Sequence, residues 1–395
     1  MTDLLENRIA AKFKEITLPI FREIALLAEQ HDALNLAGGV PDFKAPEAIK
    51  DAAIAAIRQD QNQYALTQGS APLRHKISQR IEKKHQKKWN EETEITVCCG
   101  ATEGVAATLL ALLDPGDEVI IIEPAFTIYA PDVKLFGGVP VYLTLKAPEF
   151  LIQKSALEAL ITEKTKAIIV NSPHNPTGRV FSEDELDAIA AVATEHHIFV
   201  ITDEIYDELY YEEAPSLKLW KYPNLQNQVI VINGFSKTYS VTGWRLGYIA
   251  APAFLTRAIR IAHNYLTISA ATPLQEAAAA ALDFPDTYYK GLRADYKAKR
   301  DYLLQAFEKL GIPCLKPAGG YFILADFTSL GWEDDITFAK QLITQLGVAA
   351  IPLSGFYHEK ADTSVWLRFA FCKQQETLEK AVVKLQQIKN LKKTN

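Results

Sequence analysis

Residues 233–248 read NGFSKTYSVTGWRLGY and place a single lysine, Lys237, directly after an apolar run. A lone lysine in such a place is often a residue at the edge of the core whose amine reaches solvent. The polar residues that follow the other apolar runs therefore decide whether Lys237 has a chemical role.

The middle of the chain alternates seven apolar runs with helix-like stretches. Strands this continuously apolar are typical of a largely parallel sheet that helices bury on both faces. One helix is expected over residues 182–197, where Ser182 and Glu185 have the spacing of a capping box. The runs are 95–99, 118–124, 139–145, 166–173, 198–204, 228–235 and 246–252.

The pattern changes after residue 280, where a long charged helix (288–310), scattered strands and a last helix near 374–390 indicate a smaller α+β domain. We predict an N-terminal arm with part of the small domain over residues 1–48, a large domain over 49–285 and a small domain over 286–395. The fold class is α/β, with a mainly parallel seven-stranded sheet between helices.

Ligands of open α/β sheets bind outside the carboxyl ends of the strands, so the residues after each run are the site candidates. These residues include a carboxylate, a phenol, an amide and an amine. The chain lacks a G-x-S-x-G elbow, a Walker A motif and any zinc or calcium spacing, so no metal site is expected. The candidates are Gly100, Ala101, Thr102, Pro124, Phe126, Asn171, Asn175, Asp203, Tyr206, Ser236 and Lys237.

An imine between Lys237 and an aldehyde cofactor would need three further groups: a carboxylate for the ring nitrogen, donors for the ring oxygen and an anion site for a phosphate. The stretch from Gly234 to Gly247 resembles the lysine signature of the class I and II pyridoxal-phosphate-dependent aminotransferases of fold type I, and meets it at every position. Other family motifs occur in order, from LNLAGGVPDF (34–43) to VWLRFAF (365–371). The chain is most similar to methionine and kynurenine aminotransferases.

The resemblance implies that pyridoxal 5'-phosphate is the cofactor and that Lys237 carries it. Asp203 would pair with the ring nitrogen, Asn175 and Tyr206 would donate to the ring oxygen, and Phe126 would stack on the ring. Asp203 lies three residues before Tyr206, one turn apart if a helix begins there. Taken alone, Asp203 could equally be a helix cap.

The phosphate would bind at the start of the helix after Gly100, where the amides of Ala101 and Thr102 are free. Ser236 and Arg245 would add a hydroxyl group and a charge. Residue 234 is glycine where many relatives have a phosphate-binding serine, so the choice between Ser236 and Ser240 stays open.

The resemblance also implies a homodimer, in which Tyr64 reaches the phosphate of the neighbouring subunit. Tyr64 could instead be an ordinary packing tyrosine. Arg368 would hold the substrate carboxylate, and the segment with Gly39 would close over the substrate. Without the resemblance, Arg368 would be interpreted as an edge-strand arginine that reaches solvent.

The substrate class follows from the cations that the chain lacks. Relatives specific for dicarboxylates provide a second cation, yet Glu103 follows the phosphate loop and residues 261–275 contain no arginine. We therefore expect apolar, sulfur-containing or aromatic amino acids. An aspartate-type aminotransferase and a carbon–sulfur β-lyase remain alternatives. A transcriptional regulator with an aminotransferase-like domain is disfavoured, because no basic helix-turn-helix segment precedes the catalytic domains.

The charge balance argues against binding to nucleic acid or an anionic membrane, and we expect a cytoplasmic location. The net charge is −6, from 42 Lys and Arg against 48 Asp and Glu. The start of the chain lacks a signal-peptide pattern. The four cysteines, Cys98, Cys99, Cys314 and Cys372, form no CxxC pair and are expected to be reduced.

Overall fold

The computed structural model describes residues 8–16, 18–212, 218–359 and 364–393. Residues 1–7, where the predicted N-terminal arm and the expectation of no signal peptide begin, lie outside the described residues. No helix in the described ranges is both long and apolar enough to cross a bilayer.

All seven predicted runs form strands of one seven-stranded sheet. Its order is β2-β8-β7-β6-β5-β3-β4, and β8 is antiparallel to both of its neighbours while the other pairs are parallel. The predicted α/β class with a mainly parallel sheet is therefore confirmed. The strands are β2 (Ile95–Cys98), β3 (Glu118–Glu123), β4 (Val139–Thr144), β5 (Thr165–Asn171), β6 (Phe199–Asp203), β7 (Val229–Gly234) and β8 (Gly247–Ala250).

Helices cover both faces of this sheet, as the continuous apolar runs predict. Alternate side chains of a strand enter different cores: Ile169 packs with residues of α6, α7 and α10, whereas Ile168 and Val170 pack with residues of α5 and α9. The helices before residue 285 are α2 (Lys12–Glu15), α3 (Ile20–Gln30), α4 (Glu47–Arg58), α5 (Ala71–His85), α6 (Gly100–Leu112), α7 (Tyr129–Leu135), α8 (Lys154–Glu158), α9 (Glu183–Glu195), α10 (Ala253–Thr267) and α11 (Thr272–Ala281).

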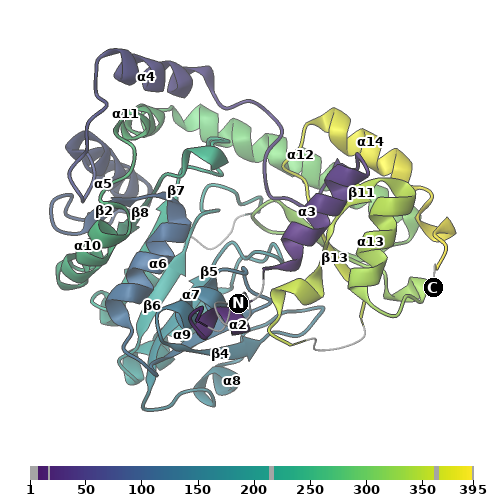
Figure 1. Cartoon of the computed structure of the whole chain (residues 1–395), viewed down its shortest axis with the longest axis horizontal. Coiled ribbons are helices and arrows are strands. Elements are labelled where there is room, and N and C mark those ends of the chain that lie inside the picture. The colour runs from purple at the N-terminus through teal and green to yellow at the C-terminus, as the bar shows by residue number, and fades with distance from the viewer. Residues whose placement is uncertain (1–7, 17, 213–217, 360–363, 394–395) are drawn as a thin grey trace.

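The C-terminal elements form a second group around an antiparallel sheet with the order β12-β13-β10-β9. The N-terminal helix α3 lies beside these elements in Figure 1, and Leu34 of β1 pairs with Val348 of β11. The division of the chain at residues 48 and 285 stays a prediction. The elements are β1 (Leu34–Asn35), α12 (Asp286–Leu310), β9 (Cys314–Leu315), β10 (Phe322–Asp326), α13 (Asp335–Leu346), β11 (Val348–Ala349), β12 (Ile351–Pro352), β13 (Trp366–Ala370) and α14 (Gln375–Leu385).

Local signals in the sequence set the helix ends. The predicted capping box of α9 is present: the Ser182 hydroxyl accepts from the Glu185 amide at 3.3 Å, and the Glu185 carboxylate accepts from the Ser182 amide at 2.9 Å. The long helix α12 ends at Gly311, whose φ of +70° suits glycine. The last helix, α14, is shorter than predicted and ends at Leu385.

Candidate active site

One cavity of about 250 Å³ lies where the carboxyl ends of β5, β6 and β7 meet the start of α6. It brings together most of the predicted site residues: Gly39, Ala101, Thr102, Phe126, Asn171, Asn175, Asp203, Tyr206, Ser236, Lys237, Arg245 and Arg368. The candidates Gly100 and Pro124 do not line it. Tyr64 is 82% exposed and lies outside this cavity. The strand ends thus gather residues that are up to 329 positions apart in sequence, from Gly39 to Arg368.

Asp203 is a buried carboxylate without an ion pair among the described residues. Its Oδ2 accepts from the Tyr129 hydroxyl at 2.7 Å, and its Oδ1 accepts from the Ile205 amide at 3.2 Å. Burial raises the pKa of Asp203, while the Tyr129 hydrogen bond opposes that rise. A cationic partner in the cavity would remove the cost of this buried charge.

Both interpretations of Asp203 from the sequence assumed that a helix begins at this residue, and the chain there is not helical. Residues 205–208 form a turn, and no helix begins at Asp203. Tyr206 therefore reaches the cavity from a turn and packs edge-on against Tyr321, with ring centroids 5.2 Å apart. Asp203 still caps a local amide, that of Ile205.

Lys237 follows β7 and turns its amine into the cavity. Its Nζ donates to the Gly39 carbonyl oxygen at 3.2 Å, and the same oxygen accepts from the Tyr321 hydroxyl at 2.8 Å. Burial lowers the pKa of Lys237 to about 8. Near pH 8 a large fraction of this amine is therefore unprotonated and nucleophilic, unlike that of an ordinary lysine.

This pKa gives a pH prediction for the cofactor-free protein. Labelling of Lys237 by a small aldehyde and a reductant should rise with pH and level off above a midpoint near 8, because only the unprotonated amine reacts. Mass spectrometry of the Lys237 peptide would measure the rate at each pH. A midpoint near the ordinary lysine value of about 10.4 would contradict it.

The start of α6 lies against the guanidinium of Arg245, which belongs to the segment after Lys237. Gly100 has a φ of +84°, and a Cβ there would lie 2.7 Å from the Arg245 guanidinium. The same guanidinium donates to the Thr102 hydroxyl at 3.4 Å. Ser236 lines the cavity, whereas Ser240 donates to the Phe43 carbonyl at 3.0 Å, so the position favours Ser236 as the phosphate-binding serine.

Arg368 is buried, with 2% of its surface exposed, and lies on β13 between two other strands. This position rules out the edge-strand interpretation. Its guanidinium donates to Asn175 Oδ1 at 2.7 Å and to the Ala37 carbonyl at 2.8 Å, while its Nε has no hydrogen-bond partner in the part of the chain that the structure describes. Burial lowers its pKa to about 10, so the group remains a cation at neutral pH.

Sequence reasoning assigned no role to several residues of the cavity. Phe21 and Phe322 flank the Arg368 guanidinium, whose carbon lies 5.2 and 4.0 Å from the ring centroids. Asn171 donates to the Asp203 carbonyl at 2.9 Å and accepts from the Asn175 amide at 2.9 Å. Only Asn171, as a polar residue at a strand exit, carried a sequence signal.

Tyr129 is the missed residue with the most direct contact to the predicted site. Tyr129→Phe should weaken cofactor binding about 10-fold, because the buried Asp203 carboxylate loses a hydrogen bond. Titration of the cofactor-free protein with pyridoxal phosphate would measure this change. Tyr239→Phe is the control, since its hydroxyl bonds to Tyr289 and Tyr239 does not line the cavity; equal losses in both variants would contradict the assignment.

Comparison with known protein families identifies this arrangement. The sequence profile of the family "Aminotransferase class I and II" matches residues 31–385. The chain belongs to the class I and II aminotransferases. The aminotransferase is 35% identical over 378 residues to methionine aminotransferase of Escherichia coli (strain K12), a match that covers 96% of this chain and 98% of that protein. It is 36% identical to kynurenine–oxoglutarate transaminase of Dictyostelium discoideum, over 92% of each chain.

Solved structures agree with the sequence matches. N-succinyldiaminopimelate aminotransferase of Mycobacterium tuberculosis superposes with a TM-score of 0.93 at 37% identity, over 96% of this aminotransferase and 99% of that chain. The resemblance and the fold type are therefore confirmed, and the reaction is transamination between amino and 2-oxo acids.

Aminotransferases of this family use pyridoxal phosphate, and the cavity fits that group. The buried Asp203 carboxylate, which has no ion pair among the described residues, suits a protonated ring nitrogen. The space beside Gly100, which a Cβ would fill, suits a phosphate against Arg245. The Lys237 amine, with its lowered pKa, suits an aldehyde.

Proposed function

We propose that the enzyme transfers the amino group of an apolar, sulfur-containing or aromatic L-amino acid to a 2-oxo acid. The supporting observation is the cavity wall. Its apolar members include Phe21, Phe126, Ile128, Tyr129 and Phe322, and its cations among the described residues are Lys237, Arg245 and Arg368. Each cation already has a proposed partner, so none remains for a second substrate carboxylate.

The start of α6 also disfavours a dicarboxylate. In related enzymes that take dicarboxylates, a lysine can stand just after the phosphate-loop glycine. Here Glu103 lies in the first turn of α6, its Oε2 accepting from the Cys99 amide at 3.0 Å and its Oε1 lying 3.0 Å from His263 Nδ1. Glu103 does not line the Lys237 cavity, and the cavity residues at the start of α6, Ala101 and Thr102, offer no cation for a second carboxylate.

The proposed roles follow from these positions. Arg368 binds the substrate carboxylate through its planar guanidinium, and Asn175 fixes the orientation of that group. The amine of Lys237 then removes the proton from the α-carbon of the amino acid substrate. In the second half-reaction, the same amine delivers a proton to the α-carbon that derives from the 2-oxo acid. Bound pyridoxal phosphate supplies the electron sink that makes the proton on this carbon acidic. Asp203 and Tyr129 hold the ring-nitrogen end of the cofactor, and the rings around Arg368 exclude water.

A substrate survey tests the proposed class. With 2-oxoglutarate as acceptor, kcat/KM for methionine, kynurenine or phenylalanine should exceed that for aspartate at least about 10-fold, because a dicarboxylate lacks its second cation. Methionine added without an oxo acid should give one turnover per site. Continuing release of ammonia or thiol would show a lyase instead, and a preference for aspartate would contradict the proposed specificity.

We also propose a homodimer in which Tyr64 completes the partner's phosphate site. Tyr64 is 82% exposed and Tyr265 is 85% exposed, and the hydrogen bond between Thr67 and Asn264 at 2.9 Å joins their segments into one surface. Exposed aromatic residues gathered in this way are typical of an interface.

The four free thiols favour a cytoplasmic location.

Mixed dimers test the crossing residue. Tyr64→Ala and Lys237→Ala homodimers should each be nearly inactive, but dissociation and random reassembly of equal amounts should restore about a quarter of the wild-type sites, since one hybrid site is then intact. Activity and dimer content after mixing would be measured together. Hybrid dimers that stay inactive would contradict the crossing.

A further inference from the structure

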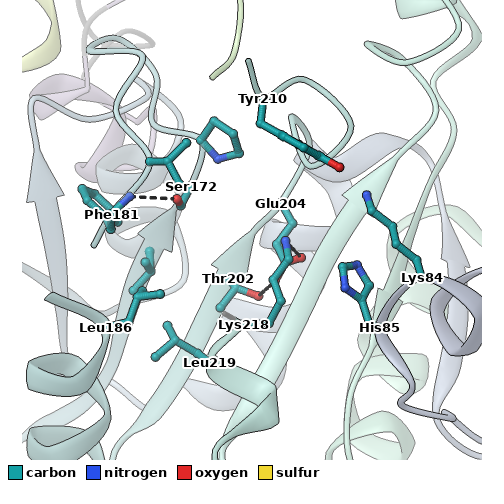
Figure 2. Close-up of a pocket in the computed structure, with 13 residues that line it drawn as sticks. Lys84, His85, Ser172, Phe181, Leu186, Thr202, Glu204, Tyr210, Lys218 and Leu219 are labelled. Carbon is teal, nitrogen blue, oxygen red and sulfur yellow. Dashed lines mark hydrogen bonds and ion pairs between the residues drawn. The ribbon is translucent and has the colours of Figure 1, made fainter. Parts of the chain in front are cut away.

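A second cavity of about 170 Å³ lies on the other face of the same sheet (Figure 2). Val170 on β5 and Thr202 on β6 line it, whereas their chain neighbours Asn171 and Asp203 line the Lys237 cavity. This arrangement arises because successive side chains of a strand point to opposite faces. The two cavities therefore share the sheet as a wall.

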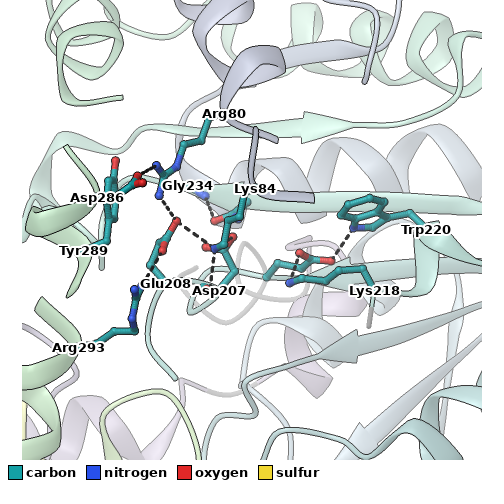
Figure 3. A network of polar contacts seen from close by, with 12 residues as sticks. Arg80, Lys84, Asp207, Glu208, Lys218, Trp220, Gly234, Asp286, Tyr289 and Arg293 are labelled. Carbon is teal, nitrogen blue, oxygen red and sulfur yellow. Dashed lines mark hydrogen bonds and ion pairs between the residues drawn. The ribbon is translucent and has the colours of Figure 1, made fainter. Parts of the chain in front are cut away.

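The charges around the second cavity are already paired with one another (Figure 3). Lys218 Nζ lies 2.6 Å from the Glu204 carboxylate, which also accepts from the Trp220 indole at 3.2 Å. Lys84 Nζ lies 3.2 Å from Asp207 Oδ2 and 3.0 Å from Glu208 Oε1. A charged ligand would have to break one of these pairs, so an uncharged ligand fits better.

His85 is a buried polar residue of the cavity. It ends α5, 9% of its surface is exposed, and its Nδ1 has no hydrogen-bond partner among the described residues. Burial lowers the pKa of His85 to about 3, so the ring is neutral. A buried polar group without a hydrogen bond carries a free-energy cost that a bound donor or acceptor would remove.

The remaining wall is mostly apolar, with hydroxyl groups from Ser172, Thr202 and Tyr210, and the cavity has a size that suits one ring. Pro173, Phe181, Leu186 and Leu219 line it. A cavity of about 150 Å³ lined by apolar side chains is known to bind benzene. The observed volume of about 170 Å³ thus holds one six-membered ring with a small substituent.

We propose that this cavity binds an uncharged, single-ring compound whose polar group pairs with His85. Asp203 lies in the chain between Thr202 and Glu204, which both line the cavity. A compound bound there contacts both neighbours of the residue that faces the cofactor ring. Its binding and cofactor binding are therefore coupled, and the coupling is reciprocal.

Phenol is the probe, because it is neutral, has one ring and carries a hydroxyl group that both donates and accepts. Titration of the pyridoxal-phosphate-loaded enzyme, followed by ligand-observed NMR, should show saturable binding with a Kd on the order of 1 mM. Benzoate, which has a similar ring but a charge, should not displace phenol. Binding that does not saturate, or displacement by benzoate, would overturn the proposal.

Variants place the binding in this cavity. Val180→Trp, which fills the cavity, should abolish phenol binding, and His85→Phe should weaken it about 5-fold through the lost hydrogen bond. Lys237→Ala is the matched control in the other cavity and, with both proteins free of cofactor, should bind phenol as tightly as the wild-type protein does. Loss of binding in Lys237→Ala, with no loss in Val180→Trp, would assign the phenol to the active site and overturn the proposal.

Two readouts do not depend on the folding of the variants. A phenol-soaked crystal of the wild-type enzyme should show the ring between His85 and Phe181, and density only elsewhere would contradict the site. Saturating phenol should also change the Kd of pyridoxal phosphate at least about 2-fold, measured on the cofactor-free protein. An unchanged Kd would overturn the coupling.

Discussion

Lys237→Ala is expected to lower kcat for transamination at least about 10³-fold, because the variant loses both the covalent attachment of the cofactor and the group that moves the α-proton. Nearby groups do not replace the amine: among the described cavity residues the other cations are the two arginines. Arginine stays protonated and cannot act as the base. Steady-state rates, with cofactor content measured on the same sample, would test the loss.

Lys373 offers a matched control for this substitution. It is also buried, at 5% exposure, and its Nζ donates to the Val40 carbonyl at 2.8 Å, one residue from the carbonyl that Lys237 contacts. Lys373→Gln keeps a donor there and should change kcat less than about 3-fold. Added methylamine should partly restore Lys237→Ala and should have no effect on Lys373→Gln. Equal losses in the two variants, without rescue, would show that Lys237 acts only through the fold.

Much of the large sheet could be predicted because its signal is local. Each apolar run is long enough to cross a sheet that is buried on both faces, and each became a strand. The strand order and the reversed direction of β8 depend on pairings between distant segments, such as Gly234 with Gly247 and Cys98 with Gly247. No run of residues encodes these pairings by itself. The short strand β9, which pairs with β10, was hidden for the same reason.

The residues of the site also fall into those that the sequence identifies and those that only the folded structure shows. Residues at strand exits, such as Asp203 and Lys237, could be selected from the sequence because topology brings strand ends together. Tyr129 could not, since its role depends on a side-chain contact across 74 positions to Asp203. His85 likewise looks like an ordinary residue at a helix end. Only the packing of α5 against the sheet shows that its Nδ1 lacks a hydrogen-bond partner among the described residues.

Arg368→Gln is expected to lower kcat/KM for amino acids about 10²- to 10³-fold. The substrate carboxylate loses its bidentate cation, and Asn175 Oδ1 and the Ala37 carbonyl lose a charged donor inside a buried site. Arg368→Lys keeps the charge without the planar fork and should lose less. The measurement compares each amino acid with the primary amine that lacks its carboxylate, since the amine does not use Arg368.

The ratio of these two rates separates recognition from stability. Arg300 is the control: it is equally buried, at 1% exposure, and donates to the Pro317 carbonyl at 2.9 Å, but does not line the cavity. Arg300→Gln should lower thermal stability and leave the ratio of amino acid to amine unchanged. Arg368→Gln should bring that ratio close to one, because only the carboxylate-bearing substrate loses binding energy. A ratio that stays at the wild-type value in Arg368→Gln would move the carboxylate site elsewhere, and Arg368 would then serve to join β13 to the segment around Ala37.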